Sequence, residues 1–416
     1  MGFWRRRATR ARARFANLGT NSRAHGANWR GNSFAKRLNS VEPVLSVSKF
    51  LRSRIDAGDF PSAVYVVAEK GEPVFADALG DAVLAPEKHP ATLETIYDLA
   101  SLTKPLVTGL LCARLVQAGT LTLDAPVAEY LPEFNRPDKN SLTIGHLATH
   151  TSGLPAWRPL YLLASKKEAA LEAIANETLE YKPGERVVYS DLGFIVLGFL
   201  LQRLTDTSLV ESAQREIFDP LKLQHTFFNP ARAMQTGIAA CEAGNAYERD
   251  MCETGAAKDP AATGLGTNWR SQMIWGEVHD GNAYFLGGAA GHAGLFSNAL
   301  ETLRIADQFI ADQSELLARE TCALFRQNLT EGLNEARSFA WQLAATSDST
   351  GGPALPPDAF GHTGFTGTSC WIDASDQSVF ILLTNRTHNR SLPFANINAV
   401  RREFHSLAVA ALNVRS

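Results

Sequence analysis

A serine and a lysine stand three positions apart in SLTK (101–104), directly before the apolar segment PLVTGLLCARLVQAG. Side chains three apart share one face of a helix, so Ser101 and Lys104 are predicted to lie side by side. A lysine enclosed by apolar groups loses basicity and can then accept or relay a serine proton. The pair therefore indicates a serine nucleophile. A second match, Ser46 to Lys49, has no apolar helix behind it and is interpreted as a decoy.

Two later segments carry further polar groups. YSD (189–191) follows a Pro-Gly turn and precedes an apolar helix, so Tyr189 and Asp191 are predicted to project from a loop. HTG (362–364) is predicted to open a strand whose glycine lets a substrate approach the backbone closely. Structural alternatives remain open: Ser101 or Asp191 as helix caps, Tyr189 in the core, and His362 as an exposed residue.

Motifs for other mechanisms are missing from the sequence. It contains no GxSxG elbow, P-loop, dinucleotide fingerprint or HExxH helix. His150, His279-Asp280 and His292 lack metal-ligand spacing, so they are interpreted as structural or substrate-lining residues. No metal site and no cofactor is predicted.

The three segments, in this order, resemble the motifs SxxK, Y-x-N and K-T-G of the serine β-lactamase and penicillin-binding-protein superfamily. The chain is most similar to the class C β-lactamase branch, which also includes esterases and D-peptidases. The resemblance covers roughly residues 42–412, including HTSGL (150–154), PLKL (220–223), GHAGLFS (291–297) and LLTNR (382–386).

The resemblance implies a role for each matching position. Ser101 becomes the acylated nucleophile, with Lys104 and Tyr189 as the proton-transfer pair. The backbone N–H groups of Ser101 and Phe365 form the oxyanion hole. The substrate side is lined by Asp191, His362, Thr363 and Gly364.

The implied function is hydrolysis of esters, amides or peptides of small to moderate size through an acyl-enzyme. A true β-lactamase or D-Ala-D-Ala carboxypeptidase and a catalytically silent scaffold are the alternatives. Asp191 and His362 replace the amide and lysine of the family pattern, so we expect weaker attraction for a substrate carboxylate. If these two side chains meet, Asp191 is expected to raise the pKa of His362.

The elements that position these residues predict an α+β fold. A hairpin is expected over 62–80, an apolar helix over 105–118 ending at Gly119, and late strands over 338–344, 368–374 and 378–385. A final amphipathic helix is expected over 395–412. The strands would form one antiparallel sheet flanked by helices, in an α/β lobe of about 41–119 and 295–416. A mainly helical lobe of about 120–294 would be inserted into it.

Composition excludes several classes of protein. The 416 residues are 45% hydrophobic and 20% charged, with a net charge of −3. Residues 1–40 hold ten basic residues and no acidic one, so the remainder has a net charge of −13, which argues against nucleic-acid binding. The 1–40 segment is predicted to be a disordered basic leader, with neither a Sec-type signal nor an apolar run of membrane-spanning length. A cytoplasmic location is the default, and the resemblance leaves a periplasmic one open.

Overall fold

A computed structural model describes residues 42–254 and 269–414; the predicted basic leader lies outside them. A seven-stranded antiparallel sheet has the order β3-β2-β1-β9-β8-β7-β6. Its strands are β1 (Ser62–Glu69), β2 (Glu72–Val83), β3 (His89–Pro90), β6 (Gln342–Leu343), β7 (Phe360–Thr363), β8 (Ser369–Asp373) and β9 (Ser378–Thr384). Strands from the two ends of the chain therefore form one sheet, and the predicted α+β fold is confirmed.

The predicted hairpin over 62–80 is confirmed. Lys70 and Gly71 both have positive φ, 53° and 77°, as the tight turn between β1 and β2 requires. On its other edge β1 pairs antiparallel with β9, where Ala63 faces Thr384. This pairing joins the early and late segments of the chain.

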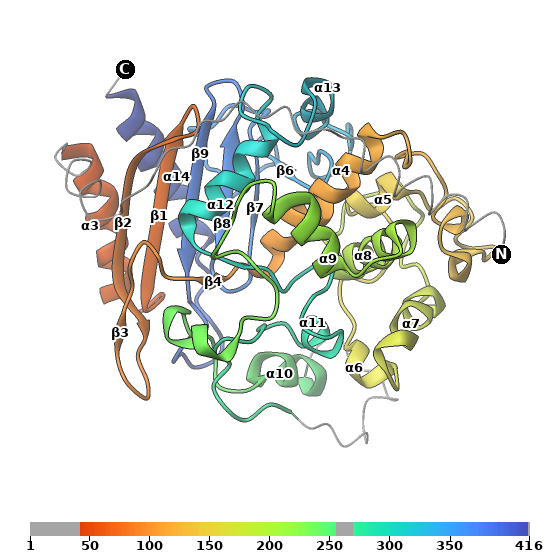
Figure 1. The fold of residues 1–416 in the computed structure, drawn as a ribbon, viewed down its shortest axis with the longest axis horizontal. Coiled ribbons are helices and arrows are strands. Elements are labelled where there is room, and N and C mark those ends of the chain that lie inside the picture. The colour runs from red at the N-terminus through yellow and green to blue at the C-terminus, as the bar shows by residue number, and fades with distance from the viewer. Residues whose placement is uncertain (1–41, 255–268, 415–416) are drawn as a thin grey trace.

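Two hydrophobic cores lie on opposite faces of the sheet because side chains alternate along each strand. Tyr65 of β1 packs with Phe404 on the face covered by α3 (Glu42–Asp56) and α14 (Asn398–Asn413). Val64 and Val66 belong to the larger core on the other face, which includes α4 (Leu110–Gln117) and α12 (Ala299–Ala306). In Figure 1, α3 lies to the left of the sheet, α14 passes behind its strands, and most other helices lie to its right.

The segment between the early and late strands is mainly helical. Its helices are α5 (Ile144–Ala148), α6 (Leu160–Leu163), α7 (Ala170–Asn176), α8 (Asp191–Thr205), α9 (Leu209–Ala213), α10 (Ala246–Thr254) and α11 (Gly281–Phe285); α13 (Arg319–Cys322) follows α12. A small sheet pairs β4 (Tyr97–Asp98) with β5 (Phe296–Ser297). The division into two lobes stays a prediction.

In the described ranges, no single helix is both long and apolar enough to cross a membrane. One pair, α8 with residues 209–218, meets the criteria only when joined across a 76° bend.

Three predictions about elements were wrong in detail. The helix expected over 105–118 is a π-helix (Lys104–Gly109) followed by α4; Pro105 supplies no N–H, and Gly109 packs against Ala340. HTG ends β7 instead of opening a strand, and the strand expected over 338–344 shrinks to β6. The decoy Ser46 lies within α3, a helix that was not predicted.

The prediction that Gly119 ends the apolar helix is confirmed by its positive φ of 64°. The final helix also forms, as α14.

Candidate active site

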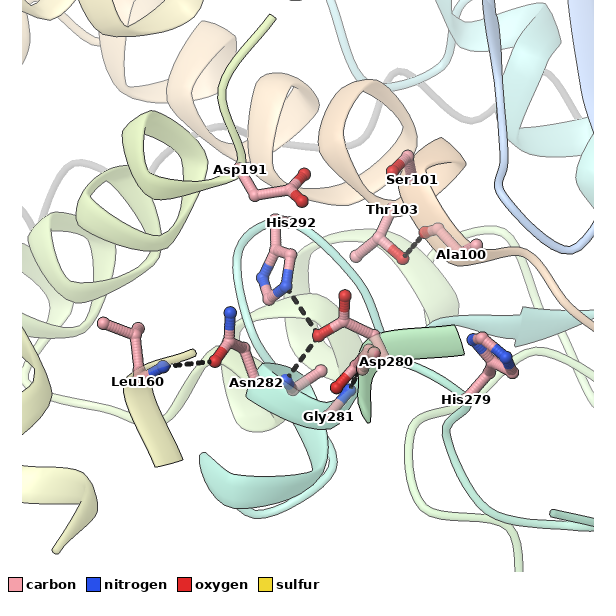
Figure 2. Close-up of polar contacts among 12 residues, drawn as sticks. Ala100, Ser101, Thr103, Leu160, Asp191, His279, Asp280, Gly281, Asn282 and His292 are labelled. Atoms are coloured by element: carbon pink, nitrogen blue, oxygen red, sulfur yellow. Dashed lines mark hydrogen bonds and ion pairs between the residues drawn. The ribbon is translucent and has the colours of Figure 1, made fainter. Parts of the chain in front are cut away.

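Ser101 lies on a tight turn between β4 and the π-helix. The residue before it, Ala100, has a φ of 48°, a left-handed conformation that is strained for a residue with a side chain. Two hydrogen bonds hold this turn: Ala100 N–H donates to Asp98 Oδ1 (2.8 Å), and the Thr103 hydroxyl donates to Ala100 O (2.7 Å, Figure 2). The turn places Ser101 on the wall of a cavity of about 390 Å³.

Lys104 is fully buried, one turn after Ser101. Its Nζ donates to Ser101 Oγ (2.9 Å) and to the backbone oxygen of His292 (3.1 Å), and it forms an ion pair with Asp191 Oδ1 (2.7 Å). A carboxylate this close favours the charged form of the lysine.

The charge state of Lys104 corrects the expectation that it loses basicity. Burial by itself lowers the pKa of Lys104, but the Asp191 carboxylate, together with the contact to Tyr189, outweighs it and raises this pKa above its usual 10.5. The sequence argument considered only the apolar helix and could not identify the carboxylate that arrives from α8.

Tyr189 contacts both Ser101 and Lys104, and its role as the proton-transfer partner of Lys104 stays a prediction. Its hydroxyl is hydrogen-bonded to both side chains, and Lys104 Nζ lies 4.9 Å from the ring centroid. Burial is the main cause of the raised pKa of Tyr189, so the phenol is protonated at neutral pH. The rings of His150 and His362 lie against it, with centroids 4.6 and 5.7 Å away, and hold it in place.

Asp191 contacts Lys104 and makes no contact with His362. It is the first residue of α8, and the cap is Ser190, whose hydroxyl accepts from Gly193 N–H. His362 is 5% exposed, and burial together with the Lys104 and Arg337 cations holds its pKa well below 6.5. The condition under which Asp191 was expected to raise the pKa of His362 is therefore not met, and His362 is a neutral side chain near neutral pH.

The loop after β7 holds the proposed oxyanion donor. Phe365 N–H donates to no described residue, and Phe365 lines the same cavity as Ser101. Gly364 permits close contact with the nucleophile turn, because a Cβ there would lie 2.5 Å from Leu99 O and 2.1 Å from Thr368 Oγ1. It also lines the cavity, and the approach of a substrate to its backbone stays a prediction. Thr363 also lines the cavity, as predicted.

Two arginines that the sequence analysis missed anchor this loop. Arg401 of α14 donates to Gly364 O (2.8 Å) and Thr368 O (3.0 Å), and Arg386 donates to Phe365 O (2.6 Å). Arg386 also lies over the Phe365 ring, 4.7 Å from its centroid. No spacing signal could identify them, because they approach the loop from distant positions.

Asp280 and His292, two of the residues first considered for metal binding, help to position Lys104. Asp280 accepts from His292 Nε2 (2.8 Å) and from Ala283 N–H at the start of α11, as Figure 2 shows. Asp280 thereby fixes His292, whose carbonyl holds Lys104. Burial alone would raise the pKa of Asp280, but His292 lowers it overall. In the described residues no group of three or more His, Cys, Asp or Glu side chains is placed to hold a metal ion.

The family and the fold agree with this geometry. The family described as Beta-lactamase matches residues 47–402. A protein named "Putative D-alanyl-D-alanine carboxypeptidase" from Escherichia coli (strain K12) is 32% identical over 377 residues, 84% of each chain. One of the same name from Salmonella typhimurium is 32% identical over 83% of each chain.

Solved structures are similar at lower identity. EstCE1, a hydrolase with promiscuous acyltransferase activity, has a TM-score of 0.67 at 22% identity, over 88% of this chain and 98% of its own. A penicillin-binding protein homologue from Caulobacter crescentus has a TM-score of 0.67 at 18% identity, over 89% and 98%. The fold is therefore shared with both. Because the family match covers most of the chain and the relatives are 32% identical over more than four fifths of it, this chain belongs to the beta-lactamase family, in its class C-like branch.

Proposed function

We propose that this protein is a serine hydrolase that forms an acyl-enzyme on Ser101 and cleaves esters or amides of small to moderate size. The observation that supports this most directly is the contact of one hydroxyl with two proton-handling groups. Ser101 Oγ accepts from Lys104 Nζ at 2.9 Å and is hydrogen-bonded to Tyr189. Acyl transfer needs such an activated oxygen nucleophile, with hydrogen-bond donors near the developing oxyanion.

The proposed reaction starts with Lys104 charged and Tyr189 protonated, as the directions of their pKa shifts favour. Ser101 Oγ attacks the carbonyl carbon, and the carbonyl oxygen accepts from the backbone N–H groups of Ser101 and Phe365. Tyr189 takes the Ser101 proton while passing its own to the leaving group. Lys104 stays an ammonium and stabilises negative charge on Tyr189. Water then attacks the ester formed on Ser101, and the same steps in reverse release the acid.

A D-Ala-D-Ala carboxypeptidase is the second candidate, and the names of the 32% identical relatives favour it. Such a substrate ends in a carboxylate. The two arginines nearest the proposed oxyanion hole, Arg386 and Arg401, already donate to loop carbonyls. The neutral His362 supplies no cation, which supports the expected weak attraction for a substrate carboxylate. We therefore predict that neutral esters react faster than penicillins.

One experiment separates the candidates. Purified protein is mixed with p-nitrophenyl butyrate, with a peptide ending in D-Ala-D-Ala, and with a penicillin, and turnover of each is measured. We expect a butyryl-enzyme on Ser101, loss of turnover in Ser101→Ala, and wild-type turnover in the decoy control Ser46→Ala. Release of D-alanine faster than ester hydrolysis would support the carboxypeptidase instead. No labelling by any of the three would support the silent scaffold.

A further inference from the structure

A second cavity, of about 400 Å³, begins on the other side of Tyr189. Tyr189 and Thr363 line both cavities, whereas Ser101, Gly364 and Phe365 line only the first. Its volume lies in the range of ordinary small-molecule sites. The two cavities therefore adjoin at Tyr189, the residue that is proposed to protonate the leaving group.

The wall of the second cavity is mainly polar. Side chains with amide or hydroxyl groups supply much of it: Asn334, Gln342, Thr346, Ser347, Thr350 and Asn398. Such a wall offers both donors and acceptors, and it offers little apolar surface to an alkyl chain. A ligand group that fills it must itself form several hydrogen bonds.

The charges in this wall disfavour an anion. Arg337 donates to Glu335 through Nη2 (2.7 Å) and Nε (3.0 Å), so its charge is already paired. Asp348, the remaining acidic side chain of the wall, is exposed. His362 is neutral: its Nδ1–H donates to Thr363 O (2.9 Å), and its buried Nε2 bonds to no described residue. The described part of this wall thus presents one paired cation against two carboxylates.

We infer that the second cavity binds the leaving group of the substrate, and that this leaving group is neutral and rich in hydroxyl groups, such as a glycerol or sugar unit. The inference rests on the proposed acyl-enzyme at Ser101. With the carbonyl held between Ser101 and Phe365, the acyl chain occupies the first cavity. The leaving oxygen must lie within hydrogen-bond reach of Tyr189, which is where the second cavity begins.

The test uses one acyl group with four leaving groups: methyl butyrate, butyl butyrate, 1-butyrylglycerol and the butyryl ester of glycerate. We expect kcat/KM for 1-butyrylglycerol to exceed that for the butyl and glycerate esters by about tenfold, since one or two good hydrogen bonds are worth ~1.4 kcal/mol. A higher kcat/KM for the glycerate ester than for 1-butyrylglycerol would overturn the inference, because it would show that the cavity binds a carboxylate. Higher kcat/KM for the butyl ester would overturn it equally.

A variant at the cavity mouth provides the matched control. Ser347 is exposed and lies in a turn, so Ser347→Phe is expected to fill part of the cavity without disturbing the core, and Ser347→Ala removes only the hydroxyl. Ser347→Phe should lower kcat/KM for 1-butyrylglycerol about tenfold and leave methyl butyrate unchanged. An equal loss for both esters, or no loss, would contradict the assignment.

Failure of the proposed function has a different signature from failure of this inference. If Ser101 forms no acyl-enzyme, no ester of the series turns over and p-nitrophenyl butyrate leaves no butyryl group on the protein. If only the leaving-group assignment is wrong, the butyryl-enzyme forms and the four esters lack the expected order.

Discussion

Replacing Asp191 by asparagine tests how the buried charge of Lys104 is maintained. Asparagine keeps a carbonyl oxygen at the position that accepts from Lys104 Nζ but removes the negative charge. Asp191 Oδ1 lies 2.7 Å from a lysine that is fully buried, while the Asp191 side chain is 18% exposed. The substitution therefore changes the electrostatics of the site far more than its packing.

The size of the effect follows from this distance. At 2.7 Å, with an effective dielectric constant of about 20, the two charges attract by about 6 kcal/mol before desolvation is counted. Removing one partner of a buried ion pair typically destabilises a protein by about 3–5 kcal/mol. The loss of stability at pH 7 cannot exceed about 5 kcal/mol, because a larger penalty would make Lys104 release its proton instead. That limit is the cost of deprotonating a lysine with the usual pKa of 10.5 at pH 7, at about 1.4 kcal/mol for each pH unit. We expect about 3 kcal/mol.

Denaturant unfolding between pH 7 and pH 11 measures this loss. In the wild type the pKa of Lys104 is raised, so its contribution to stability is complete below 10.5 and is lost as the pH rises through the folded-state pKa. In Asp191→Asn burial is no longer opposed by a carboxylate, so the pKa of Lys104 falls. The penalty is then largest at neutral pH and disappears near 10.5. The stability gap between the two proteins should narrow as the pH rises.

Kinetics give the refuting result. If Lys104 acts as an ammonium, kcat/KM of Asp191→Asn should fall at least about tenfold at neutral pH and decline further as the pH rises through the lowered pKa. A variant whose kcat/KM instead rises with pH, relative to the wild type, would show that neutral Lys104 is the base. Equal stability of the two proteins from pH 7 to pH 11 would show that the ion pair does not hold the charge.

Three further predictions concern neighbouring groups. Burial raises the pKa of Glu248, which lines the first cavity, to about 7, so the folded protein loses stability relative to the unfolded chain as the pH rises from 4.5 to 7. Glu248→Gln lacks this loss. Its stability relative to the wild type should therefore increase by up to about 3 kcal/mol between pH 5 and pH 8, measured by denaturant unfolding at both pH values. A constant difference would contradict this. Gly364→Ala should reduce turnover at least about tenfold, because its Cβ collides with Leu99 O. The control Gly237→Ala should not, because its Cβ would have no atom within 4 Å. Equal activities of the two variants would show that the Gly364 loop can move to accept the Cβ without loss of turnover. Lys104→Ala and Tyr189→Phe should each abolish most acylation, and the double variant should be little worse than either in single-turnover assays. Full additivity would mean that the two groups do not share a proton path.

Local patterns predicted much of the fold and of the site. The Lys70-Gly71 turn between two β-rich runs was sufficient for the first hairpin. The order of SLTK, YSD and HTG was sufficient to group Ser101, Tyr189 and Thr363 around one cavity. These signals depend on residues close in sequence or on an ordered set of motifs, and both can be read from the sequence.

The parts that failed depend on contacts between distant segments. Asp191 stands 87 positions after Lys104, and nothing in either segment indicates which basic side chain this carboxylate will pair with. The anchoring of the Gly364 loop by Arg401 requires α14 to cross behind the sheet. The π-helix after Ser101 likewise reflects the packing of Gly109 on Ala340, which belongs to a late segment.

The central claim, acylation of Ser101, is tested most directly by peptide mass spectrometry after rapid acid quenching of the protein mixed with p-nitrophenyl butyrate. The account predicts one butyryl group, on the peptide that contains Ser101, appearing before steady-state turnover and missing in Ser101→Ala. Turnover without any modified peptide at early times in the wild type, or a butyryl group at another serine with Ser101→Ala still active, would contradict it.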